Sequence, residues 1–376
     1  MTDLCIVGAG VCGVAAAYEA CRRGLDVVLV DRGDVGGGAS SNSMHVAHGG
    51  LRYLQSLDLA RSFESIRERR RLLRLAPHCV RPFPFRLDRS GHGAAYRGLV
   101  RVGLLANDVL SLHRNRGVRA DRRLPRARGG VWYDALIEDT ERLMVDALHG
   151  ADAAPGTLSV RTYADAPPPP AACTLRCTGA HRASAPGAAA VLSMNLVLPR
   201  LPGFDGDMGV ALRHPDDGRN VFVTSVGDRS VVGTHDRAYA GDPSRPLVLE
   251  SGWIDDVIAW LRPVHPALSR LARRDLRRVH AGLLPGEGAK PGERAVVESD
   301  AGGVVHAQPV KWTTAWGVAL RAVDRVCARL GRPAADLPDR PLPDGRQLQA
   351  GSGIDPVRFA VEREWARRLD DVLLRR

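Results

Sequence analysis

The first thirty residues place two short apolar runs on either side of a helical pattern. The runs are Leu4–Val7 and Val27–Val30, and small apolar residues recur with helical spacing between Val14 and Ala20. Four consecutive apolar residues next to a turn are typical of a buried strand, and the segment between the runs is long enough for a helix. The pattern therefore predicts a strand, a helix and a second strand.

The turn between the first strand and the helix has a Gly-x-Gly-x-x-Gly pattern, made by Gly8, Gly10 and Gly13. Gly8 permits the tight turn, Gly10 lets the backbone approach a pyrophosphate, and Gly13 lets the helix pack closely on the strand. The phosphates would rest on free N–H groups at the helix N-terminus. Asp31 ends the second strand, where a carboxylate hydrogen-bonds a ribose hydroxyl and disfavours a 2′-phosphate. The pattern predicts a site for NAD or FAD.

The residues that follow suit the rest of such a cofactor. Gly36–Ser43 is small and polar, with many N–H and hydroxyl donors for phosphates and a ribityl chain. A few residues later, the chain brings together His48, Gly49–Gly50, Arg52 and Tyr53. The two glycines would let a flat ring lie against the backbone.

Later patterns predict a second region. Val221–Thr224 and Ser230–Gly233 alternate like the two strands of a hairpin that turns at Gly227-Asp228. Ile254–Leu261 has a helical pattern. Between the two regions, Ala164–Ala172 is rich in proline, which predicts a stiff, extended linker.

Composition narrows the class of protein. The chain has 376 residues, 44% of them hydrophobic, so it is long enough for two domains with sizeable cores. It has no apolar run of about 18 residues that would span a membrane. The glycine pattern begins eight residues from the first methionine, which leaves no room for a signal peptide. We therefore expect a cytoplasmic protein.

Cysteine usage and charge exclude some kinds of site and partner. The seven cysteines are odd in number and scattered, which predicts reduced thiols. Cys173 and Cys177 have no His or Cys cluster beside them, so no metal site is expected. The net charge is +11, but aromatic residues make up only 5% of the chain and do not interleave with basic ones, so no nucleic-acid partner is expected. The basic surface allows at most peripheral contact with the inner face of a membrane.

The segment His48–Leu54 has the sequence His-Gly-Gly-Leu-Arg-Tyr-Leu. In this it resembles the FAD-dependent glycerol-3-phosphate dehydrogenases and, more broadly, the glycine oxidase-like FAD oxidoreductases. Asp139 is expected to cap a helix in one of the further matching segments. These segments are the arginine-rich helix and Leu-Ala-Pro-His break of 63–84, the helix entry of 130–147, the strand and loop of 232–243, and Lys311–Thr314 ahead of a helix predicted for Val318–Leu330.

The resemblance covers most of the chain and implies both cofactor and fold. The implied cofactor is FAD. The implied fold is α/β: a Rossmann-type FAD-binding domain with an inserted antiparallel-sheet substrate domain and a truncated C-terminal helical segment. The expected boundaries are 1–90, 131–182 and 301–330 for the FAD-binding domain, 91–130 and 183–300 for the substrate domain, and 331–376 for the shortened helical cap.

The resemblance also implies the residues of the site. Arg52 and Lys311 are positive charges suited to an anionic group, and Tyr53 is a hydrogen-bond donor. His48 and His235 are the candidate bases for a hydroxyl proton. The helix after Lys311 would direct its positive end at the flavin. The residues expected to hold FAD are Gly8, Gly10, Cys12, Gly13, Asp31, Arg32, Ala39, Ser40, Ser41, His48, Gly49, Gly50, Thr178, Gly179, Lys311, Trp312, Thr313 and Thr314.

The chain departs from the family pattern in ways that bear on the substrate. Leu284 stands where the family has an arginine that helps to hold substrate, and Asn195 where it has a histidine. The β-meander before Thr178 is mostly missing, as is the middle of the C-terminal cap. We expect hydride transfer to flavin N5 from the secondary alcohol of a small polyol, phosphorylated or carrier-bound substrate other than glycerol 3-phosphate, as in a biosynthetic pathway.

Two other hypotheses stay open. One is an FAD-dependent amine or amino-acid oxidase of the glycine oxidase type, which would release hydrogen peroxide with amino acids. The other is a degenerate FAD-binding protein with a non-catalytic role, whose flavin no substrate would bleach. The electron acceptor is a quinone, oxygen or another protein, and no motif decides among them.

Overall fold

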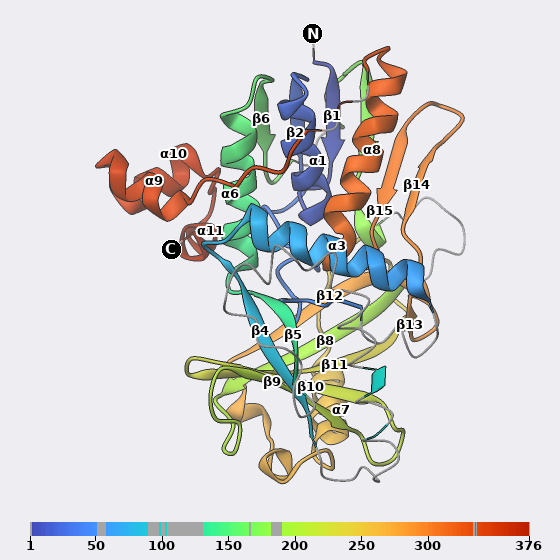
Figure 1. Ribbon diagram of the computed structural model, residues 1–376, viewed down its shortest axis with the longest axis vertical. Helices are drawn as coiled ribbons and strands as arrows, with labels where there is room; N and C mark the ends of the chain where they lie inside the picture. The colour runs from blue at the N-terminus through green and yellow to red at the C-terminus, as the bar shows by residue number, and fades with distance from the viewer. Residues whose placement is uncertain are drawn as a thin grey trace.

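The computed structural model describes residues 2–50, 58–88, 98, 102–103, 131–164, 167–181, 190–333, 335 and 337–375. These residues form two β-sheets, which lie one above the other in Figure 1. The helix α3 (Leu59–Leu75) crosses the molecule between the two sheets. The predicted α/β fold is therefore present, with the cofactor motif in the upper sheet.

The upper sheet has six strands in the order β14-β15-β7-β1-β2-β6. All neighbours are parallel except the β14–β15 hairpin. The predicted strand–helix–strand unit is confirmed, because Leu4 pairs with Val27 and Val7 with Val30 in parallel register. The strands are β1 (Leu4–Val7), β2 (Val27–Val30), β6 (Leu158–Arg161), β7 (Cys173–Arg176), β14 (Val296–Ser299) and β15 (Val305–Gln308).

Three helices cover one face of the six-stranded sheet: α1 (Val11–Arg22), α6 (Thr140–Asp152) and α8 (Ala315–Arg329). The helix α6 begins at the predicted cap, where the Asp139 carboxylate accepts a hydrogen bond from the Arg142 backbone N–H at 2.8 Å. On the other face, Ala171 packs against a small apolar cluster that includes Cys5 and Val28. The proline-rich segment therefore lies on the face opposite the helices.

The lower sheet has nine strands in the order β13-β12-β8-β11-β10-β9-β4-β5-β3. Its β4–β9 pair is parallel, so the sheet is mixed and not fully antiparallel as expected. The hairpin predicted around Gly227-Asp228 is confirmed: Val226 pairs with Arg229 across that turn. The strands are β3 (Val46–Ala47), β4 (Val80–Leu87), β5 (Val131–Ile137), β8 (Ala190–Pro199), β9 (Met208–Arg213), β10 (Asn220–Val226), β11 (Arg229–Tyr239), β12 (Arg278–Glu287) and β13 (Lys290–Pro291).

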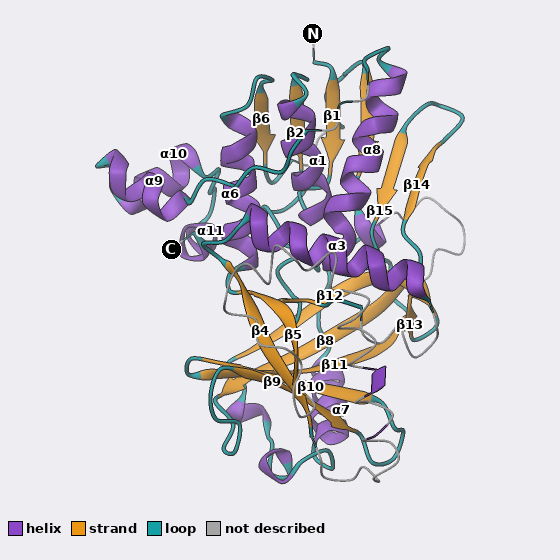
Figure 2. Ribbon diagram, in the orientation of Figure 1, coloured by secondary structure: helices purple, strands orange, loops and turns teal. Residues whose placement is uncertain are grey.

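The two faces of the nine-stranded sheet have different neighbours. One face packs against α7 (Ser251–Leu261), where Met194 and Leu196 of β8 share a core with Val257 of α7. Figure 2 shows α7 below the strands and α3 above them. Side chains on the upper face are therefore placed to meet the cofactor-binding segments. Four 3₁₀ turns complete this part of the fold: η1 (Gly179–His181), η2 (Pro266–Leu268), η3 (Arg273–Asp275) and η4 (Trp312–Thr314).

The strand pairing groups some segments differently from the expected domain ranges, which stay predictions. The strands β3, β4 and β5 fall within the ranges expected for the FAD-binding domain but belong to the nine-stranded sheet. The strand β14 falls within the range expected for the substrate domain but pairs with β15 in the six-stranded sheet. Pairing is set by contacts between distant segments, which a pattern along the chain does not reveal. Most of 91–130 lies outside the described residues.

The last described helices are α9 (Gly345–Ser352), α10 (Pro356–Arg363) and α11 (Leu369–Leu374). They lie beside α6, at the left of Figure 1. All three fall in the range 331–376, for which a shortened helical cap is expected. No described helix is both long enough and apolar enough to cross a bilayer.

Candidate active site

The carboxyl ends of three adjacent parallel strands converge on the glycine-rich turn. Gly8 follows β1, Asp31 follows β2, and Thr178 follows β7 by two residues. Gly8 has a φ of 105°, and a Cβ on it would lie 2.6 Å from the carbonyl oxygen of Cys177. Only glycine fits both that conformation and that contact. The carboxyl edge of such a sheet is where ligands bind in doubly wound α/β folds.

The N-terminus of α1 is suited to a pyrophosphate. Gly13 packs so closely on the turn that a Cβ there would collide with the carbonyl oxygen of Gly8. The N-cap residue, Gly10, offers no side chain to the first turn, and Cys12 of that turn is buried. The Val11 N–H donates to Ser40 Oγ at 3.0 Å. A helix N-terminus whose N-cap is glycine, with a serine hydroxyl on its first N–H, fits the phosphates of a dinucleotide.

Asp31 and Arg32 lie at the end of the turn where the adenosine half would bind. The Asp31 carboxylate accepts hydrogen bonds from the backbone N–H groups of Ala9 at 2.6 Å and Gly33 at 2.8 Å. It therefore ties the two turns together, and its remaining lone pairs fit a ribose hydroxyl. Arg32 contacts His181 Nδ1 at 2.8 Å and donates to the carbonyl oxygen of Ser244, so it joins this edge to the lower domain.

The polar loop after β2 is held by segments from far along the chain. The indole Nε1 of Trp312 donates to the carbonyl oxygen of Ser40 at 2.9 Å. A Cβ on Gly282 of β12 would lie 2.7 Å from Cα of Ala39. Ser41, next in the loop, is buried. The loop expected to hold the ribityl chain is thus in contact with both η4 and the nine-stranded sheet.

The glycine pair Gly49–Gly50 and the segment that begins at Lys311 both contact Ser65 of α3. A Cβ on Gly50 would lie 2.9 Å from Cβ of Ser65, and Lys311 Nζ donates to Ser65 Oγ at 2.6 Å. Two segments more than 250 positions apart in the chain therefore flank one serine. The expectation that a flat ring lies between them requires this proximity. Thr313 and Thr314, next to the lysine, are buried in η4.

His48 is oriented by a buried carboxylate. Asp134 of β5 accepts from His48 Nδ1 at 3.0 Å and from Trp132 Nε1 at 3.3 Å on one oxygen. Its other oxygen accepts from the Gly49 N–H at 2.6 Å and from Arg69 Nη1 at 3.0 Å. Because Nδ1 faces a carboxylate, the neutral imidazole carries its lone pair on Nε2. That nitrogen is the atom of His48 that can accept a proton.

The electrostatics keep Asp134 ionised. Burial alone would raise the pKa of this carboxyl, but the hydrogen bonds and charges of His48, Arg69 and the Gly49 N–H outweigh it and lower the pKa to about 2. A carboxylate that is charged at every physiological pH stabilises an imidazolium beside it. The pair therefore has the arrangement that general-base catalysis requires.

Aromatic rings form one wall around His48. Its ring centroid lies 6.0 Å from that of Phe85 and 5.7 Å from that of Phe222. Phe85 stacks on Trp132 at 5.7 Å. The His48 side chain is 46% exposed, so the ring is held at the edge of this apolar wall and is still accessible.

The structure places His235, the second candidate base, on the face of the sheet that packs against α7. His235 lies opposite Met194 in the β8–β11 pair, and Met194 is in the core shared with α7. Its ring packs edge-on against Trp260 of α7 at 4.9 Å. A β-bulge after Val232 adds one residue to β11, which turns His235 to the α7 face and Asp236 to the opposite face.

The surroundings of His235 also oppose a catalytic role. Burial, together with the nearby charges of Arg219 and Arg237, lowers its pKa to about 4. Its Nδ1 is buried without a hydrogen-bond partner among the described residues. The ring is therefore a neutral part of the α7 core.

The two substituted positions lie on the upper face of the sheet. Asn195 is buried, and its side-chain oxygen accepts from Thr234 Oγ1 at 2.9 Å. Leu284 pairs with Val191, in the same register that places Gly282 opposite Ser193 and near the polar loop. An apolar side chain therefore occupies the position of the family's arginine.

A cavity of about 280 Å³ adjoins β3, ahead of His48. The rings of His45 and His280 stack on one wall at 5.1 Å. Burial lowers the pKa of both, that of His280 to about 4, so this wall is uncharged at neutral pH. The lining residues are Met44, His45, Leu136, Ile137, Glu138, Val197, Thr224, Val226, Arg229, Val231 and His280.

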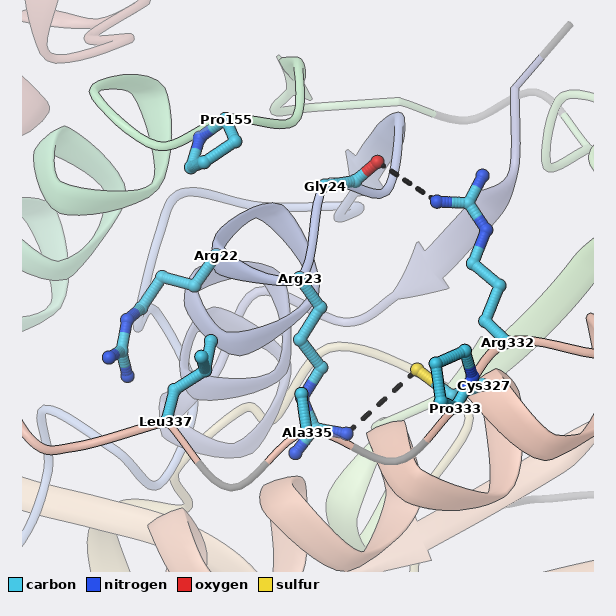
Figure 3. A pocket seen from close by; sticks show the side chains of 9 residues that line it. All are labelled: Arg22, Arg23, Gly24, Pro155, Cys327, Arg332, Pro333, Ala335 and Leu337. Atoms are coloured by element: carbon cyan, nitrogen blue, oxygen red, sulfur yellow. Dashed lines mark hydrogen bonds between the residues drawn. The ribbon is translucent and has the colours of Figure 1, made fainter.

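A second cavity, of about 370 Å³, lies at the other end of the parallel strands and is shown in Figure 3. Gly24 and Pro155 line it, and they precede β2 and β6. Its arginines form ion pairs, including Arg23 with Asp324 at 2.6 Å. The cavity is therefore far from the glycine-rich turn and is not the cofactor site.

The sequence patterns missed two residues of this site and named two that lie outside the described residues. Arg52 and Tyr53 are in the second group, so their expected roles stay predictions. The missed residues are Ser65 and Asp134. Asp134 left one signal, an acid within the otherwise apolar strand Val131–Ile137. Ser65 left none, because its role arises from the crossing of α3 between the sheets.

A dinucleotide turn on a parallel sheet, joined to a second sheet that carries an oriented histidine, defines a two-domain nucleotide-dependent oxidoreductase. The chain belongs to the family of FAD-dependent oxidoreductases, whose model matches residues 3–325. This match confirms FAD as the predicted cofactor.

Individual relatives agree with the family and differ in length. The chain is 28% identical over 323 residues to the glycerol-3-phosphate dehydrogenase of Pseudomonas aeruginosa, covering 75% of this chain and 61% of that one. It is 27% identical to the D-erythritol 1-phosphate dehydrogenase of Brucella abortus, covering 75% and 63%. A Bacillus halodurans glycerol-3-phosphate dehydrogenase structure complexed with FAD superposes with a TM-score of 0.63 at 20% identity, covering 89% and 66%. The chain thus spans less than two thirds of the length of these relatives.

Proposed function

We propose that this chain oxidises the secondary alcohol of a small polyol phosphate or a related anionic or carrier-bound substrate. Bound FAD would supply the two-electron acceptor, with hydride arriving at flavin N5. The observation that carries the proposal is the His48–Asp134 pair beside Gly49, next to the Lys311–Ser65 contact. In this proposal His48 supplies the base and Lys311 the positive charge beside the position expected for the flavin ring.

The chain's own residues would divide the work as follows. His48 Nε2 takes the hydroxyl proton, because Nδ1 is held by the Asp134 carboxylate. The Asp134 charge then stabilises the imidazolium that forms. Lys311 provides a fixed positive charge for an oxyanion or a phosphate, and Ser65 Oγ fixes the position of its ammonium group.

The cofactor would be held along one path. The N-terminus of α1 would hold the pyrophosphate, Asp31 the ribose, and the loop of Ala39–Ser41 the ribityl chain. The 3₁₀ turn η4 leads directly into α8, which begins at Ala315. The positive end of that helix would lie near the ring and favour its reduced, anionic form.

The substrate proposal rests on Leu284, which stands on the upper face of the nine-stranded sheet where the family has an arginine. Leu284 cannot form the bidentate contact of an arginine, which as a charge-assisted hydrogen bond is worth about 1.5–3 kcal/mol. The similarity to a D-erythritol 1-phosphate dehydrogenase supports a polyol phosphate longer than glycerol 3-phosphate. The acceptor for the electrons is a quinone, oxygen or another protein.

The test is anaerobic reduction of the FAD-loaded protein. Polyol phosphates of three, four and five carbons, and glycine, are each mixed with the protein while the visible flavin absorbance is followed. We expect bleaching by a four- or five-carbon polyol phosphate that is faster than bleaching by glycerol 3-phosphate. Rapid bleaching by glycerol 3-phosphate alone would overturn the substrate proposal. Bleaching by glycine with release of hydrogen peroxide in air would favour an amine oxidase.

A further inference from the structure

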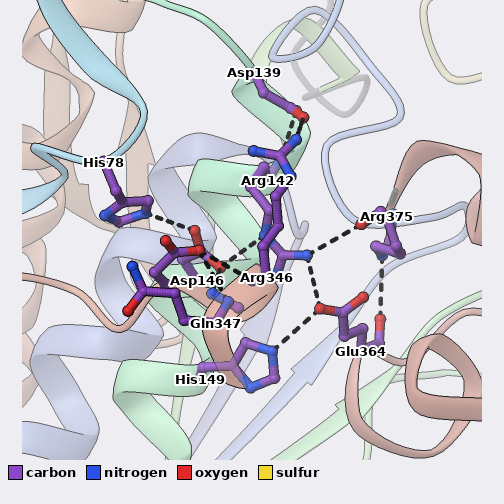
Figure 4. A network of polar contacts seen from close by, with 11 residues as sticks. His78, Asp139, Arg142, Asp146, His149, Arg346, Gln347, Glu364 and Arg375 are labelled. Carbon is purple, nitrogen blue, oxygen red and sulfur yellow. Dashed lines mark hydrogen bonds and ion pairs between the residues drawn. The ribbon is translucent and has the colours of Figure 1, made fainter. Parts of the chain in front are cut away.

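The C-terminal helices are joined to the cofactor-binding domain by charges that are fully buried. Figure 4 shows the centre of this network. Arg142 of α6 donates from Nη1 to Glu364 Oε1 and from Nε to Asp146 Oδ1, each at 2.7 Å. All three side chains are at most 3% exposed. Glu364, at the end of α10, therefore anchors the C-terminal segment to α6.

A second contact runs from this segment to the turn after β2. Arg375, which follows α11, donates from Nη2 to Asp34 Oδ1 at 2.7 Å, and the two side chains are 1% and 8% exposed. Arg375 Nε also donates to the carbonyl oxygen of Glu364 at 3.3 Å. The Arg375 guanidinium therefore links Asp34 to Glu364, the residue that anchors α10 to α6.

A third contact reaches the same turn through Tyr163. The Tyr163 hydroxyl donates to Asp371 Oδ1 at 2.6 Å, and the Arg368 guanidinium lies over the ring at 4.0 Å. The Tyr163 N–H donates to the carbonyl oxygen of Gly33 at 3.1 Å, and the next N–H donates to the carbonyl oxygen of Asp31 at 2.9 Å. The C-terminal segment is therefore linked to the turn of Asp31–Asp34 in two ways, directly through Arg375 and indirectly from Asp371 of α11 through Tyr163.

We propose that α11 and Arg375 position the Asp31–Asp34 turn for the adenosine half of FAD, which makes Arg375 and Tyr163 positioning residues for cofactor binding. The proposal rests on the proposed function only in taking FAD as the ligand. The turn carries Asp31, whose carboxylate also holds the Ala9 N–H of the glycine-rich turn. A turn fixed before binding loses less conformational entropy when the cofactor arrives. The flavin end, at Gly50 and Lys311, is held by Ser65 and is independent of α11.

The experiment measures binding of FAD and of ADP to the apoprotein, well below its unfolding temperature. ADP carries the adenosine half alone, so it probes the turn without the flavin. The variants are Arg375→Ala, Arg375→Lys and Tyr163→Phe. The matched control is Arg358→Ala, which removes an exposed pair with Glu362 on α10.

We expect Arg375→Ala to weaken FAD and ADP by the same factor, about tenfold, with a smaller common factor for Tyr163→Phe. Arg375→Lys restores part of the loss because it keeps the charge. Arg358→Ala leaves both affinities unchanged. The visible spectrum of the bound flavin is the same in every variant, because the ring end is untouched.

Two results would overturn the inference. One is an Arg375→Ala protein whose FAD affinity equals that of the parent while only its unfolding temperature falls, since the contact would then be structural. The other is a loss of FAD affinity with unchanged ADP affinity. If Arg375→Ala does not fold, Tyr163→Phe gives the same comparison. A parent protein that binds neither ligand refutes the proposed function instead.

Discussion

Two histidines that the sequence presents as equal candidates differ in almost every physical respect. His48 faces the cofactor-binding segments, and its Nδ1 is bonded to the buried carboxylate of Asp134. His235 faces α7, and its Nδ1 has no partner among the described residues. The difference lies in which face of the nine-stranded sheet each ring occupies.

The contrast shows what makes a histidine useful as a base. A ring that packs in an apolar core is kept neutral by burial, and for His235 burial lowers the pKa to about 4. A ring at the edge of an apolar wall, with one nitrogen on a carboxylate and the other accessible, keeps its lone pair available. Both histidines lie in segments that resemble the family, and the resemblance alone does not show which face of the sheet each ring occupies.

The sharpest way to break this comparison is to remove each ring in turn. We expect His48→Asn to slow substrate-dependent flavin reduction by about 10²–10⁴-fold, the usual value of a general base, and His235→Phe to change it by less than about threefold. Stopped-flow absorbance of the FAD-loaded variants measures both. A large loss in His235→Phe with normal reduction in His48→Asn would reverse the assignment.

The next prediction concerns the orientation of His48. Asp134→Asn keeps the shape but removes the charge that holds Nδ1–H, so we expect a loss of roughly a hundredfold in flavin reduction. The effect should be larger on the reduction rate than on the apparent affinity for substrate. Trp132→Phe is the control, because it removes only the weaker bond to the same oxygen, at 3.3 Å. Equal effects of the two variants would contradict the role of the charge.

A smaller effect is expected at Lys311. Lys311→Met removes the ammonium group that is hydrogen-bonded to Ser65. We expect substrate affinity to fall by about tenfold, because one charge-assisted hydrogen bond to the substrate is lost. Ser65→Ala keeps the charge and removes only the hydrogen bond from Lys311 Nζ, so its effect should be smaller and confined to affinity. A Lys311→Met protein with unchanged affinity and a slow reduction rate would assign the lysine to the flavin rather than to the substrate.

The fold was largely predictable because its signals are local. The glycine-rich turn, the two apolar runs and the Gly227-Asp228 hairpin each depend on residues next to one another, and each is confirmed. The cap at Asp139 is confirmed for the same reason. The sheet to which β3, β4, β5 and β14 belong was not predictable in this way, because their pairing joins segments far apart in the chain.

The site was predictable only in part, for a related reason. One extra residue in β11 decides that His235 faces α7, and an alternating pattern carries no sign of such a bulge. Ser65 acquires its role only because α3 crosses between the sheets. Asp134 was visible as an acid in an apolar strand, but its partners come from residues that are 65 to 86 positions away.

The last prediction uses the buried histidine itself. The pKa of His235 is about 4 in the folded chain against about 6.5 when unfolded, so the unfolded state binds the extra proton between these values. The contribution of the neutral His235 ring to the free energy of unfolding is therefore fully present above pH 6.5 and is lost as the pH falls toward 4.

His235→Phe tests this, because phenylalanine keeps the edge-on contact with Trp260 and cannot titrate. We expect the loss of unfolding free energy between pH 7 and 4.5 to shrink by about 1 kcal/mol, a figure discounted because the ring is only half-buried. Denaturant unfolding at the two pH values measures it, and an unchanged difference would show that His235 is solvated like an ordinary surface histidine.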